Sequence, residues 1–326
     1  MAGDSELDQA VAVLRAGGLV AFPTETVYGL GADASNAAAV RKIFVVKGRP
    51  ATHPLIVHLA DAVQLANWAR EVPEAARRLT RKFWPGPLTV ILKRAPGVSD
   101  VVTGGQDTVA LRVPSHPLAL QLLARFGGGI AAPSANRHGR VSATTAEHVR
   151  SEFGAAVDCV LDGGDTQIGI ESTIIDCSGA GAALLRPGWI TRRDIEAALG
   201  AALAAPPADA PRVPGTLAAH YAPRTPLALV EGERAAELAR EHARQGRRVA
   251  VLALSARRPP LEGLEWIAAP RDAAGYAHAL YASLRRLDDS GCDTILVEQP
   301  PRSPEWAAIN DRLARAAAGT SAPDET

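Results

Sequence analysis

The chain has 326 residues, and its 35 Lys and Arg are balanced by 35 Asp and Glu, so its formal net charge is zero. This length suffices for two domains with ordinary cores, and neutrality excludes a global field that would attract nucleic acid or an anionic membrane. No apolar run is long enough to span a bilayer, and no charged leader precedes an apolar N-terminal segment. The three cysteines lie far apart and predict neither a disulfide framework nor a zinc site. We therefore expect a cytoplasmic protein.

The first 200 residues predict alternating strands and helices. Strands are expected at 19–22, 55–59, 88–93, 108–113, 129–132, 157–161, 172–177 and 183–185. Helices are expected at 37–46, after Asp61, up to Phe83 or Trp84, at 117–126, from the capping-box spacing of 144–147 to Gly154, and at 191–199. Ser35 or Asn36 would cap the first of these helices and Gly48 would end it. The pattern indicates an α/β domain over residues 1–200.

The composition changes after residue 200. The range 201–214 is rich in Ala and Pro without periodicity, which is typical of a linker, and this linker extends to residue 226. It contains His220-Tyr221-Ala222-Pro223. A second pattern then predicts parallel strands at 227–230, 248–254 and 294–297, with helices near 232–245, 272–290 and 304–318. A small doubly wound domain is therefore expected over 227–326, without a GxGxxG or Walker motif.

Two separated segments give the strongest functional signal. Lys47-Gly48-Arg49-Pro50 follows the end of a predicted helix, and Ser134-Ala135-Asn136 leaves a predicted strand. Two cations this close repel each other unless an anion lies between them, and a triphosphate suits a planar Arg fork beside a Lys point charge. Strand ends are also where open α/β sheets place ligands. The alternative for the basic segment is a solvated turn.

Strand alternation singles out Arg112. In 108–113 the apolar Val109, Leu111 and Val113 share one face, while Thr108, Ala110 and Arg112 share the other. An Arg among apolar neighbours needs an anion or solvent. Its partner could be an internal carboxylate or a substrate carboxylate. His58 shares a face with Ile56, and by itself it reads as a hydrogen-bonded core histidine.

Two more segments suggest ligand loops. Residues 22–31 form a hydroxyl-rich turn bounded by glycines, and Glu171-Ser172-Thr173 opens a strand after Gly163-Gly164. No catalytic triad, carboxylate pair or zinc signature accompanies them. An enzyme built from these residues would act by positioning and electrostatic stabilisation, without a covalent nucleophile.

Taken in order, these segments resemble the threonylcarbamoyl-AMP synthase family. The resemblance covers about residues 8–224, and its matching pieces are FPTETVYGLG, KGRPATHPLIVH, WPGPLTVIL, LRVPSH, APSANRHGRVSAT, IESTIID, LLRPGWIT and PGTLAAHYAP. The last piece and the second α/β pattern match the long, two-domain form. The resemblance implies a YrdC-like first domain, with a twisted, open mixed sheet and a positively charged concave cleft, and a smaller Rossmann-like parallel α/β domain.

The resemblance also implies a reaction. L-Threonine, bicarbonate or CO2, and ATP would give threonylcarbamoyl-AMP and pyrophosphate. A partner tRNA threonylcarbamoyl transferase complex would then modify an adenosine of tRNA. Stable nucleic-acid binding by this chain and a membrane partner are not expected.

The residue roles implied by the resemblance fall into two sets. One set would bind L-threonine and the other ATP. Lys47 and Arg49, which belong to the ATP set, would also be the catalytic, charge-stabilising residues. Mg2+ would bind through the phosphates, with no side-chain ligand assigned. One departure is that His53 stands where many members carry Asn. The L-threonine set is Thr26, His58, Arg112, Ala132 (through its backbone) and Ser172. The ATP set is Lys47, Arg49, His53, Thr108, Ser134, Asn136, Ser142, Arg186, and His220 and Tyr221 as a lid from the linker.

Two rival functions remain open on sequence. A basic cleft could bind RNA as a module without ATP chemistry, although net neutrality argues against this. A related domain also occurs in carbamoyl transfer for hydrogenase maturation, but this chain has too few cysteines for the zinc fingers of those proteins. For the second domain we expect a scaffold or lid-positioning role.

Overall fold

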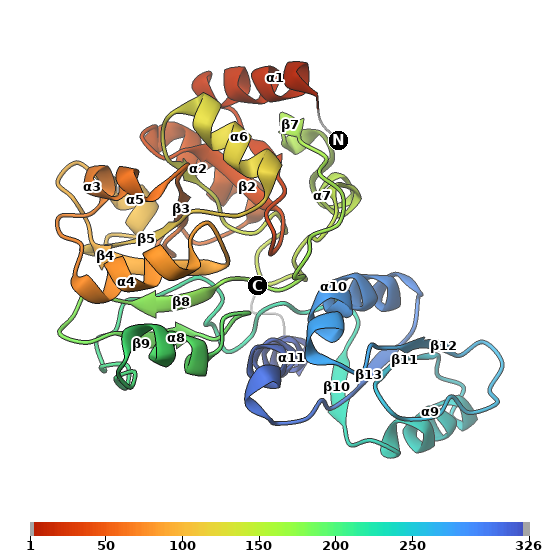
Figure 1. Cartoon of the computed structure of the whole chain (residues 1–326). Coiled ribbons are helices and arrows are strands. Elements are labelled where there is room, and N and C mark those ends of the chain that lie inside the picture. The colour runs from red at the N-terminus through yellow and green to blue at the C-terminus, as the bar shows by residue number, and fades with distance from the viewer. Residues whose placement is uncertain (1–2, 322–326) are drawn as a thin grey trace. The chain divides into compact units, whose positions relative to one another are not determined.

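The computed structural model describes residues 3–321, with side chains through 319. Two compact units are present (Figure 1). The first comprises the chain up to His138 together with Ala143–Thr216, and the second comprises Gly139–Ser142 together with the chain from Leu217 onward. Each unit contains one sheet with its own helices.

The first unit is built on a nine-stranded sheet in the order β7-β1-β2-β6-β3-β5-β4-β8-β9. The pairs β1–β7, β3–β5 and β4–β8 are parallel, and the other neighbours are antiparallel. The sheet is therefore mixed, as expected. Its strands are β1 (Val20–Phe22), β2 (Gly29–Asp33), β3 (Ile56–His58), β4 (Leu88–Lys93), β5 (Thr108–Arg112), β6 (Ile130–Ala131), β7 (Cys159–Val160), β8 (Thr173–Asp176) and β9 (Ala183–Arg186).

The helices predicted in the first unit begin and end largely where expected, whereas α1 (Asp4–Arg15) and α5 (Asp100–Thr103) were not predicted. The Asn36 side chain caps α2 by accepting from the N–H groups of Ala38 and Ala39, each at 3.1 Å, and Gly48 ends the helix with φ 61°. The helices are α1 (Asp4–Arg15), α2 (Ala37–Lys47), α3 (Leu65–Trp68), α4 (Glu74–Phe83), α5 (Asp100–Thr103), α6 (Pro117–Phe126), α7 (Ala146–Phe153) and α8 (Arg192–Leu199), with 3-10 turns η1 (Ala62–Gln64) and η2 (Gly154–Ala156).

Two local predictions in this unit are wrong. The cap of α7 is Thr145, whose hydroxyl accepts from His148 N at 3.1 Å, so the expected box from Thr144 to Glu147 does not form. Residues 29–31, expected as the end of a glycine-bounded turn over 22–31, instead belong to strand β2. A Cβ at Gly31 would lie 2.7 Å from the Ile130 side chain and 2.8 Å from Phe22, so glycine allows this strand to pack closely against its neighbours.

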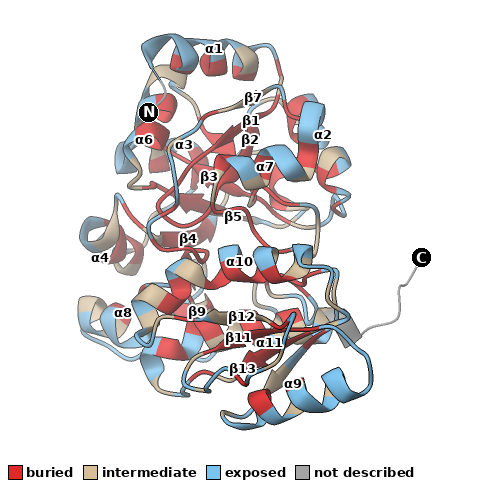
Figure 2. Ribbon diagram, turned by 90° about the vertical axis from the view of Figure 1, so that its right-hand side faces the viewer, coloured by how far each residue is buried: buried red, intermediate tan, exposed pale blue. Residues whose placement is uncertain are grey.

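The alternation predicted for β5 is confirmed. Val109, Leu111 and Val113 belong to the main core cluster of the unit, while Ala110 belongs to a separate cluster on the other face. Arg112 shares the Ala110 face and is 3% exposed. Buried residues, red in Figure 2, follow the strands, and the helices are red on one side and blue on the other.

The second unit carries a four-stranded sheet in the order β10-β13-β11-β12, and all three pairs are parallel, as expected for a Rossmann-like domain. β12 was not predicted, because Glu265–Ala268 is a short edge strand with only partly buried side chains. The elements are β10 (Leu227–Val230), β11 (Val249–Ala253), β12 (Glu265–Ala268), β13 (Thr294–Glu298), α9 (Arg234–Arg244), α10 (Ala273–Asp289), η3 (Pro304–Trp306) and α11 (Ala307–Ser321).

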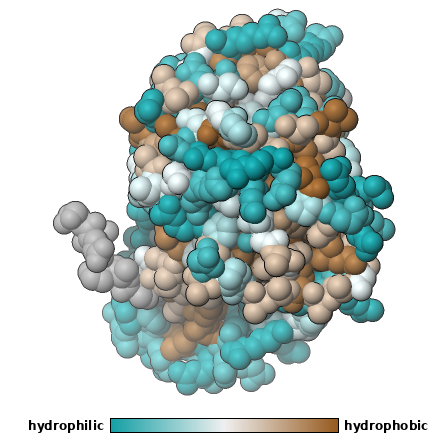
Figure 3. Space-filling view, turned by 90° about the vertical axis from the view of Figure 1, so that its left-hand side faces the viewer, coloured by the Kyte–Doolittle hydropathy of each residue, from teal (hydrophilic) through white to brown (hydrophobic). Residues whose placement is uncertain are grey.

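The surface carries few exposed large apolar side chains. Within the described chain these are Val45, Val63, Trp189 and Leu217. On the face drawn in Figure 3, brown hydrophobic residues lie among teal hydrophilic ones. Among residues 3–321, no helix combines the length and apolar character needed to cross a membrane.

Candidate active site

The two separated segments of the strongest sequence signal meet in the first unit. Lys47 is the last residue of α2, and its Nζ donates to the carbonyl oxygens of Ser134, at 2.6 Å, and Asn136. The backbone N–H of His138 in turn donates to the Lys47 carbonyl at 2.8 Å. The lysine therefore holds the 134–136 loop against the end of α2, as one site rather than two.

Burial rules out the solvated basic turn as an explanation of this segment. Lys47 is 3% and Arg49 is 7% exposed. Burial, aided by the charge of Arg49 and opposed by Glu152, lowers the pKa of Lys47 well below its ordinary value. Arg49 Nη2 donates to the Pro54 carbonyl at 3.1 Å, which fixes the guanidinium beside the turn. The cations are thus held close together by backbone acceptors.

Two histidines lie next to these cations. The rings of His53 and His138 meet edge to face, with centroids 5.4 Å apart. Burial and the charges of Arg49 and Arg212 lower the pKa of His53. The pKa of His138 is lowered to about 4 by burial and by the charges of Arg49, His53 and Lys47. Both imidazoles are therefore neutral near pH 7. His138 was not singled out from the sequence, because a lone His after the 134–136 motif carries no pattern of its own.

The turn before β2 and the 134–136 loop run side by side. Leu30 N donates to Pro133 O at 2.9 Å, and Ala135 N donates to Tyr28 O at 2.7 Å. Ala132 is buried, and its N–H bonds to the Ile56 carbonyl at 2.9 Å. These backbone contacts bring the predicted threonine-binding turn to the same edge as the cationic segment.

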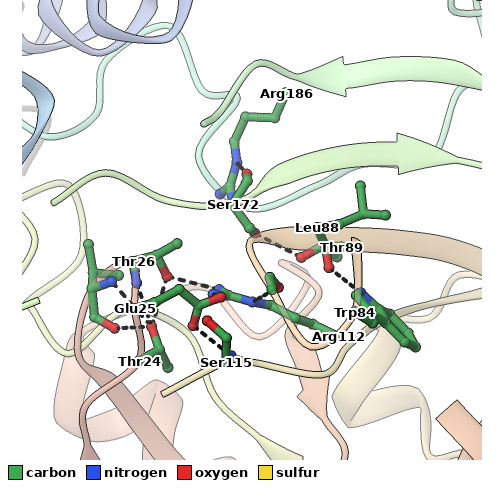
Figure 4. Close-up of polar contacts among 12 residues, drawn as sticks. Thr24, Glu25, Thr26, Trp84, Leu88, Thr89, Arg112, Ser115, Ser172 and Arg186 are labelled. Atoms are coloured by element: carbon green, nitrogen blue, oxygen red, sulfur yellow. Dashed lines mark hydrogen bonds and ion pairs between the residues drawn. The ribbon is translucent and has the colours of Figure 1, made fainter. Parts of the chain in front are cut away.

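Arg112 has an internal carboxylate partner. Its Nη2 lies 2.8 Å from Oε1 of Glu25, and both side chains are buried. Its Nη1 donates to the Thr26 hydroxyl at 2.9 Å, and its Nε donates to the Gly86 carbonyl at 3.3 Å (Figure 4). Of the two partners left open by the sequence, the internal carboxylate is the one observed. The sequence analysis did not single out Glu25, although it lies within the hydroxyl-rich turn.

Glu25 is fixed from both sides. Its second oxygen, Oε2, accepts from the Ser115 N–H at 3.1 Å. The neighbouring hydroxyls of Thr24 and Thr26 share a hydrogen bond of 2.8 Å. Because Glu25 and the Thr26 hydroxyl contact the Arg112 guanidinium at 2.8 and 2.9 Å, the turn that the sequence marked as a ligand loop holds the fork in one orientation.

His58 lies opposite Arg112 in the register of β3 and β5. It is 4% exposed, and the ring of Phe22 meets it edge to face at 5.8 Å. Burial and the Arg112 charge lower the pKa of His58 to about 3. Its Nδ1 has no hydrogen-bond partner among the described residues. Backbone groups of Ile56 and Ile130 oppose this lowering of the pKa by hydrogen bonding, which agrees with the hydrogen-bonded core histidine that the sequence suggested.

Ser172 and Arg186 contact each other directly. Arg186 Nη2 donates to the Ser172 carbonyl at 2.8 Å and to its hydroxyl at 3.2 Å, and Nη1 donates to Pro214 O at 2.9 Å. The Ser172 hydroxyl also shares a 2.8 Å hydrogen bond with Thr89, and Figure 4 shows Ser172 lying between Thr89 and Arg186. One residue predicted for threonine and one predicted for ATP therefore form a single buried group.

Four further predicted residues are placed by other parts of the structure. Thr108 begins β5 and is therefore about 13 Å along the strand from Arg112. Ser142, His220 and Tyr221 belong to the second unit. There Tyr221 adopts φ 62°, stacks on Tyr281 at 5.8 Å, and lies beneath the Arg312 guanidinium at 5.2 Å. Contact of these second-unit residues with a nucleotide stays a prediction.

The part of the chain that the structure describes contains no group of three or more His, Cys, Asp or Glu side chains placed to hold a metal ion. Two cavities of about 540 and 370 Å3 are lined by other residues, including Val63 and Trp84 in the larger one. The site consists instead of buried cations and hydroxyls at strand and helix ends.

Comparison with known proteins places this chain in a class. Residues 12–188 match the Sua5/YciO/YrdC domain model described as "Telomere recombination", and residues 190–318 match the model for the threonylcarbamoyl-AMP synthase C-terminal domain. A threonylcarbamoyl-AMP synthase from Bacillus subtilis is 44% identical across 97% of this chain and 94% of its own length.

Solved structures agree with the sequence relatives. The crystal structure of Pyrococcus abyssi Sua5 complexed with L-threonine superposes with a TM-score of 0.92, at 39% identity, over 98% of this chain and 96% of that one. A Pyrococcus abyssi Sua5 variant with an adjacent His and Tyr replaced by alanine superposes with a TM-score of 0.89, at 38% identity, over 96% of this chain and 93% of that one. The chain belongs to the threonylcarbamoyl-AMP synthase family, in its two-domain form.

Proposed function

We propose that this protein is an L-threonylcarbamoyladenylate synthase, which converts L-threonine, bicarbonate or CO2, and ATP into threonylcarbamoyl-AMP and pyrophosphate. The observation that carries the proposal is the bond from Lys47 to the 134–136 loop, because it joins a cationic and a polar segment into one buried group, which we propose as the anion site. The likeness to a Sua5 structure that contains L-threonine supports the choice of amino acid.

The threonine site is proposed around Arg112. Thr26, His58, Arg112, Ser172 and the backbone of Ala132 would hold the amino acid. Arg112 would direct its charge at the substrate carboxylate, and the open Nδ1 of neutral His58 would accept a hydrogen bond from a donor of the amino acid. A deprotonated amine would attack CO2, forming an N–C bond and a carbamate, and the amine proton would leave to water.

The ATP site is proposed around Lys47 and Arg49. A carbamate oxygen would attack the α-phosphorus in line, the bond from that phosphorus to the bridging oxygen would break, and pyrophosphate would leave with the electron pair. Buried cations would stabilise the charge that develops on the phosphates. The remaining ATP contacts are assigned to His53, Thr108, Ser134, Asn136, Ser142 and Arg186.

Three further assignments belong to this proposal. Mg2+ would bind mainly through the phosphates, where it would neutralise charge, and the oxygen-rich triphosphate is the kind of ligand that Mg2+ prefers. His220 and Tyr221, on a linker over 201–226, would close over the nucleotide, and the solved variant lacking an adjacent His and Tyr makes that pair the natural one to test. Residues 1–200 would carry catalysis, and 227–326 would position the lid.

The reactivity of the product indicates which kind of protein would consume it. A mixed anhydride of a carbamate and AMP hydrolyses readily, so a transferase complex that acts on tRNA would consume it, and we place the protein in the cytoplasm with that complex. Pyrophosphate release that requires ATP, L-threonine and bicarbonate together would support the proposal. A folded protein that releases none, yet binds RNA with strong salt dependence, would favour the RNA-binding alternative.

A further inference from the structure

Resting on the ATP site proposed above, we propose that His53 and His138 form a titratable part of the polyphosphate site and take up a proton when the triphosphate of ATP binds. His138 has no role in the assignments above, and His53 has only that of a phosphate contact. The two imidazoles would give the Lys47–Arg49 site an additional positive charge when a polyanion binds, because they would then become protonated.

The geometry places this pair between the two segments that make the anion site. His53 lies four residues after Arg49, and its N–H donates to the Pro50 carbonyl at 3.1 Å within the turn. His138 follows the 134–136 loop, and its N–H holds the Lys47 carbonyl at 2.8 Å. The two rings meet at 5.4 Å with an interplanar angle of 60°. A ligand bound between Lys47 and Arg49 would therefore face both imidazoles.

The charges around the pair explain why it is neutral without a ligand. The charge of Arg49 acts on both rings, that of Lys47 acts on His138, and that of Arg212 acts on His53, and each of these charges is positive. Glu152 acts on Lys47. Protonation of either imidazole would add a positive charge beside these cations in a half-buried place. Because this is unfavourable, the pKa of His138 falls to about 4.

A bound triphosphate reverses this balance. Even with Mg2+ bound, the triphosphate keeps a net negative charge, and an opposite charge within about 4–6 Å raises a histidine pKa. A protonated imidazole then donates from both ring nitrogens, which a neutral one cannot do. The pair would take up a proton on binding, so ATP affinity would fall as pH rises between the free-state and the bound-state pKa values. Above the bound-state pKa, this contribution would be independent of pH.

Calorimetry can count these protons. Binding of Mg2+-ATP, without threonine, would be measured at pH 6.5 in three buffers of different ionisation enthalpy. The wild type should take up at least about half a proton more per ATP than the double variant His53→Asn plus His138→Asn, as expected for groups that move toward a pKa near 6.5. AMP, which lacks the β- and γ-phosphates, should show no such difference. His278→Asn, at an exposed histidine of the second unit, is the matched control and should behave as the wild type.

The outcomes separate this inference from the proposed function. Equal proton uptake by the wild type and the double variant would overturn the inference, while leaving the synthase proposal intact. A wild type that binds no ATP would instead contradict the proposed function. Should the double variant fold poorly, imidazole NMR titration of the wild type decides: two histidine pKa values must rise when ATP is added, and unchanged values would overturn the inference.

Discussion

Oε1 of Glu25 lies 2.8 Å from Nη2 of Arg112, and neither side chain reaches solvent appreciably. The guanidinium that is proposed to hold the substrate carboxylate is therefore already neutralised by the protein. A buried ion pair of this kind need not add net stability, but loss of one partner leaves an uncompensated charge. The pair keeps the Arg112 guanidinium charged within the core, and hydrogen bonds to Thr26 and Gly86 fix its orientation.

The first prediction concerns the loss of that partner. Glu25→Gln keeps the size and an acceptor for Ser115 but leaves Arg112 without a counter-charge, so the free energy of unfolding should fall by about 3 kcal/mol. L-Threonine, whose carboxylate supplies the missing charge, should then raise the melting temperature more in the variant than in the wild type. Thermal unfolding with and without L-threonine measures both effects.

The control for that variant is Glu71→Gln. Glu71 pairs with Lys93 at the surface, with a side chain that is 59% exposed, so its loss should change stability little. A Glu25→Gln protein as stable as this control would show that the buried pair does not hold Arg112 in place.

The second prediction concerns Lys47. Lys47→Met removes the donor that holds the Ser134 and Asn136 carbonyls and removes a charge from the phosphate site, so turnover should fall by about 100-fold or more. Lys42→Met, on the same helix, loses a comparable bond to the Gly17 carbonyl at 2.6 Å and should retain near wild-type turnover. Pyrophosphate release measures both, and equal rates for the two variants would contradict the assignment.

The third prediction concerns the close approach behind Ser172. A Cβ at Gly188 would lie 2.3 Å from Thr173 N and 2.6 Å from Ser172 C, so the backbone itself would have to move. Gly188→Ala should lower the free energy of unfolding by about 2 kcal/mol and raise the KM for L-threonine through displaced Ser172. Gly179→Ala, where nothing lies within 4 Å, should change neither. Denaturant unfolding measures the stability of both variants, and substrate titration measures their KM for L-threonine. A Gly188→Ala protein that matches the Gly179→Ala control in both would contradict the prediction.

The fourth prediction concerns pH and His58. Its folded-state pKa of about 3 lies below the ordinary value of 6.5, so below pH 6.5 the unfolded chain takes up a proton that the folded chain refuses. The stability contributed by neutral His58 is present above pH 6.5 and is lost as pH falls from 6.5 toward 3, at up to about 1.4 kcal/mol per pH unit. Between pH 6 and pH 4, His58→Gln should therefore lose less stability than the wild type, as urea unfolding measures. His278→Gln should follow the wild type, and parallel curves for all three proteins would contradict the buried neutral state.

Much of the fold could be predicted from local sequence signals. Asn36 and Gly48 bound α2 as predicted, and Thr191 and Gly200 bound α8, because caps depend on nearby residues alone. β2 and β12 were missed, because a glycine-rich strand and a half-exposed edge strand lack the alternation that marks a strand. Their existence depends on neighbours far away in the chain.

In the site, too, local patterns predicted single residues but not the contacts between residues that are far apart in the sequence. Periodicity placed Arg112 on the correct face, but its pairing with Glu25 arises across 87 positions of sequence that no local pattern connects. Lys47 was recognised as part of a cationic segment, whereas its bonds to backbone carbonyls depend on how the 134–136 loop packs. His138 became visible only through its contact with His53.

The most direct test of the account is to follow labelled carbon from bicarbonate. With ATP, Mg2+, L-threonine and 14C-bicarbonate, the wild type should form one product that carries the label, the adenine absorbance and the amino acid, and Lys47→Met should form about 100-fold less of it. Label that never joins adenine, in a folded wild-type protein that still binds ATP, would contradict the proposal that this site builds threonylcarbamoyl-AMP.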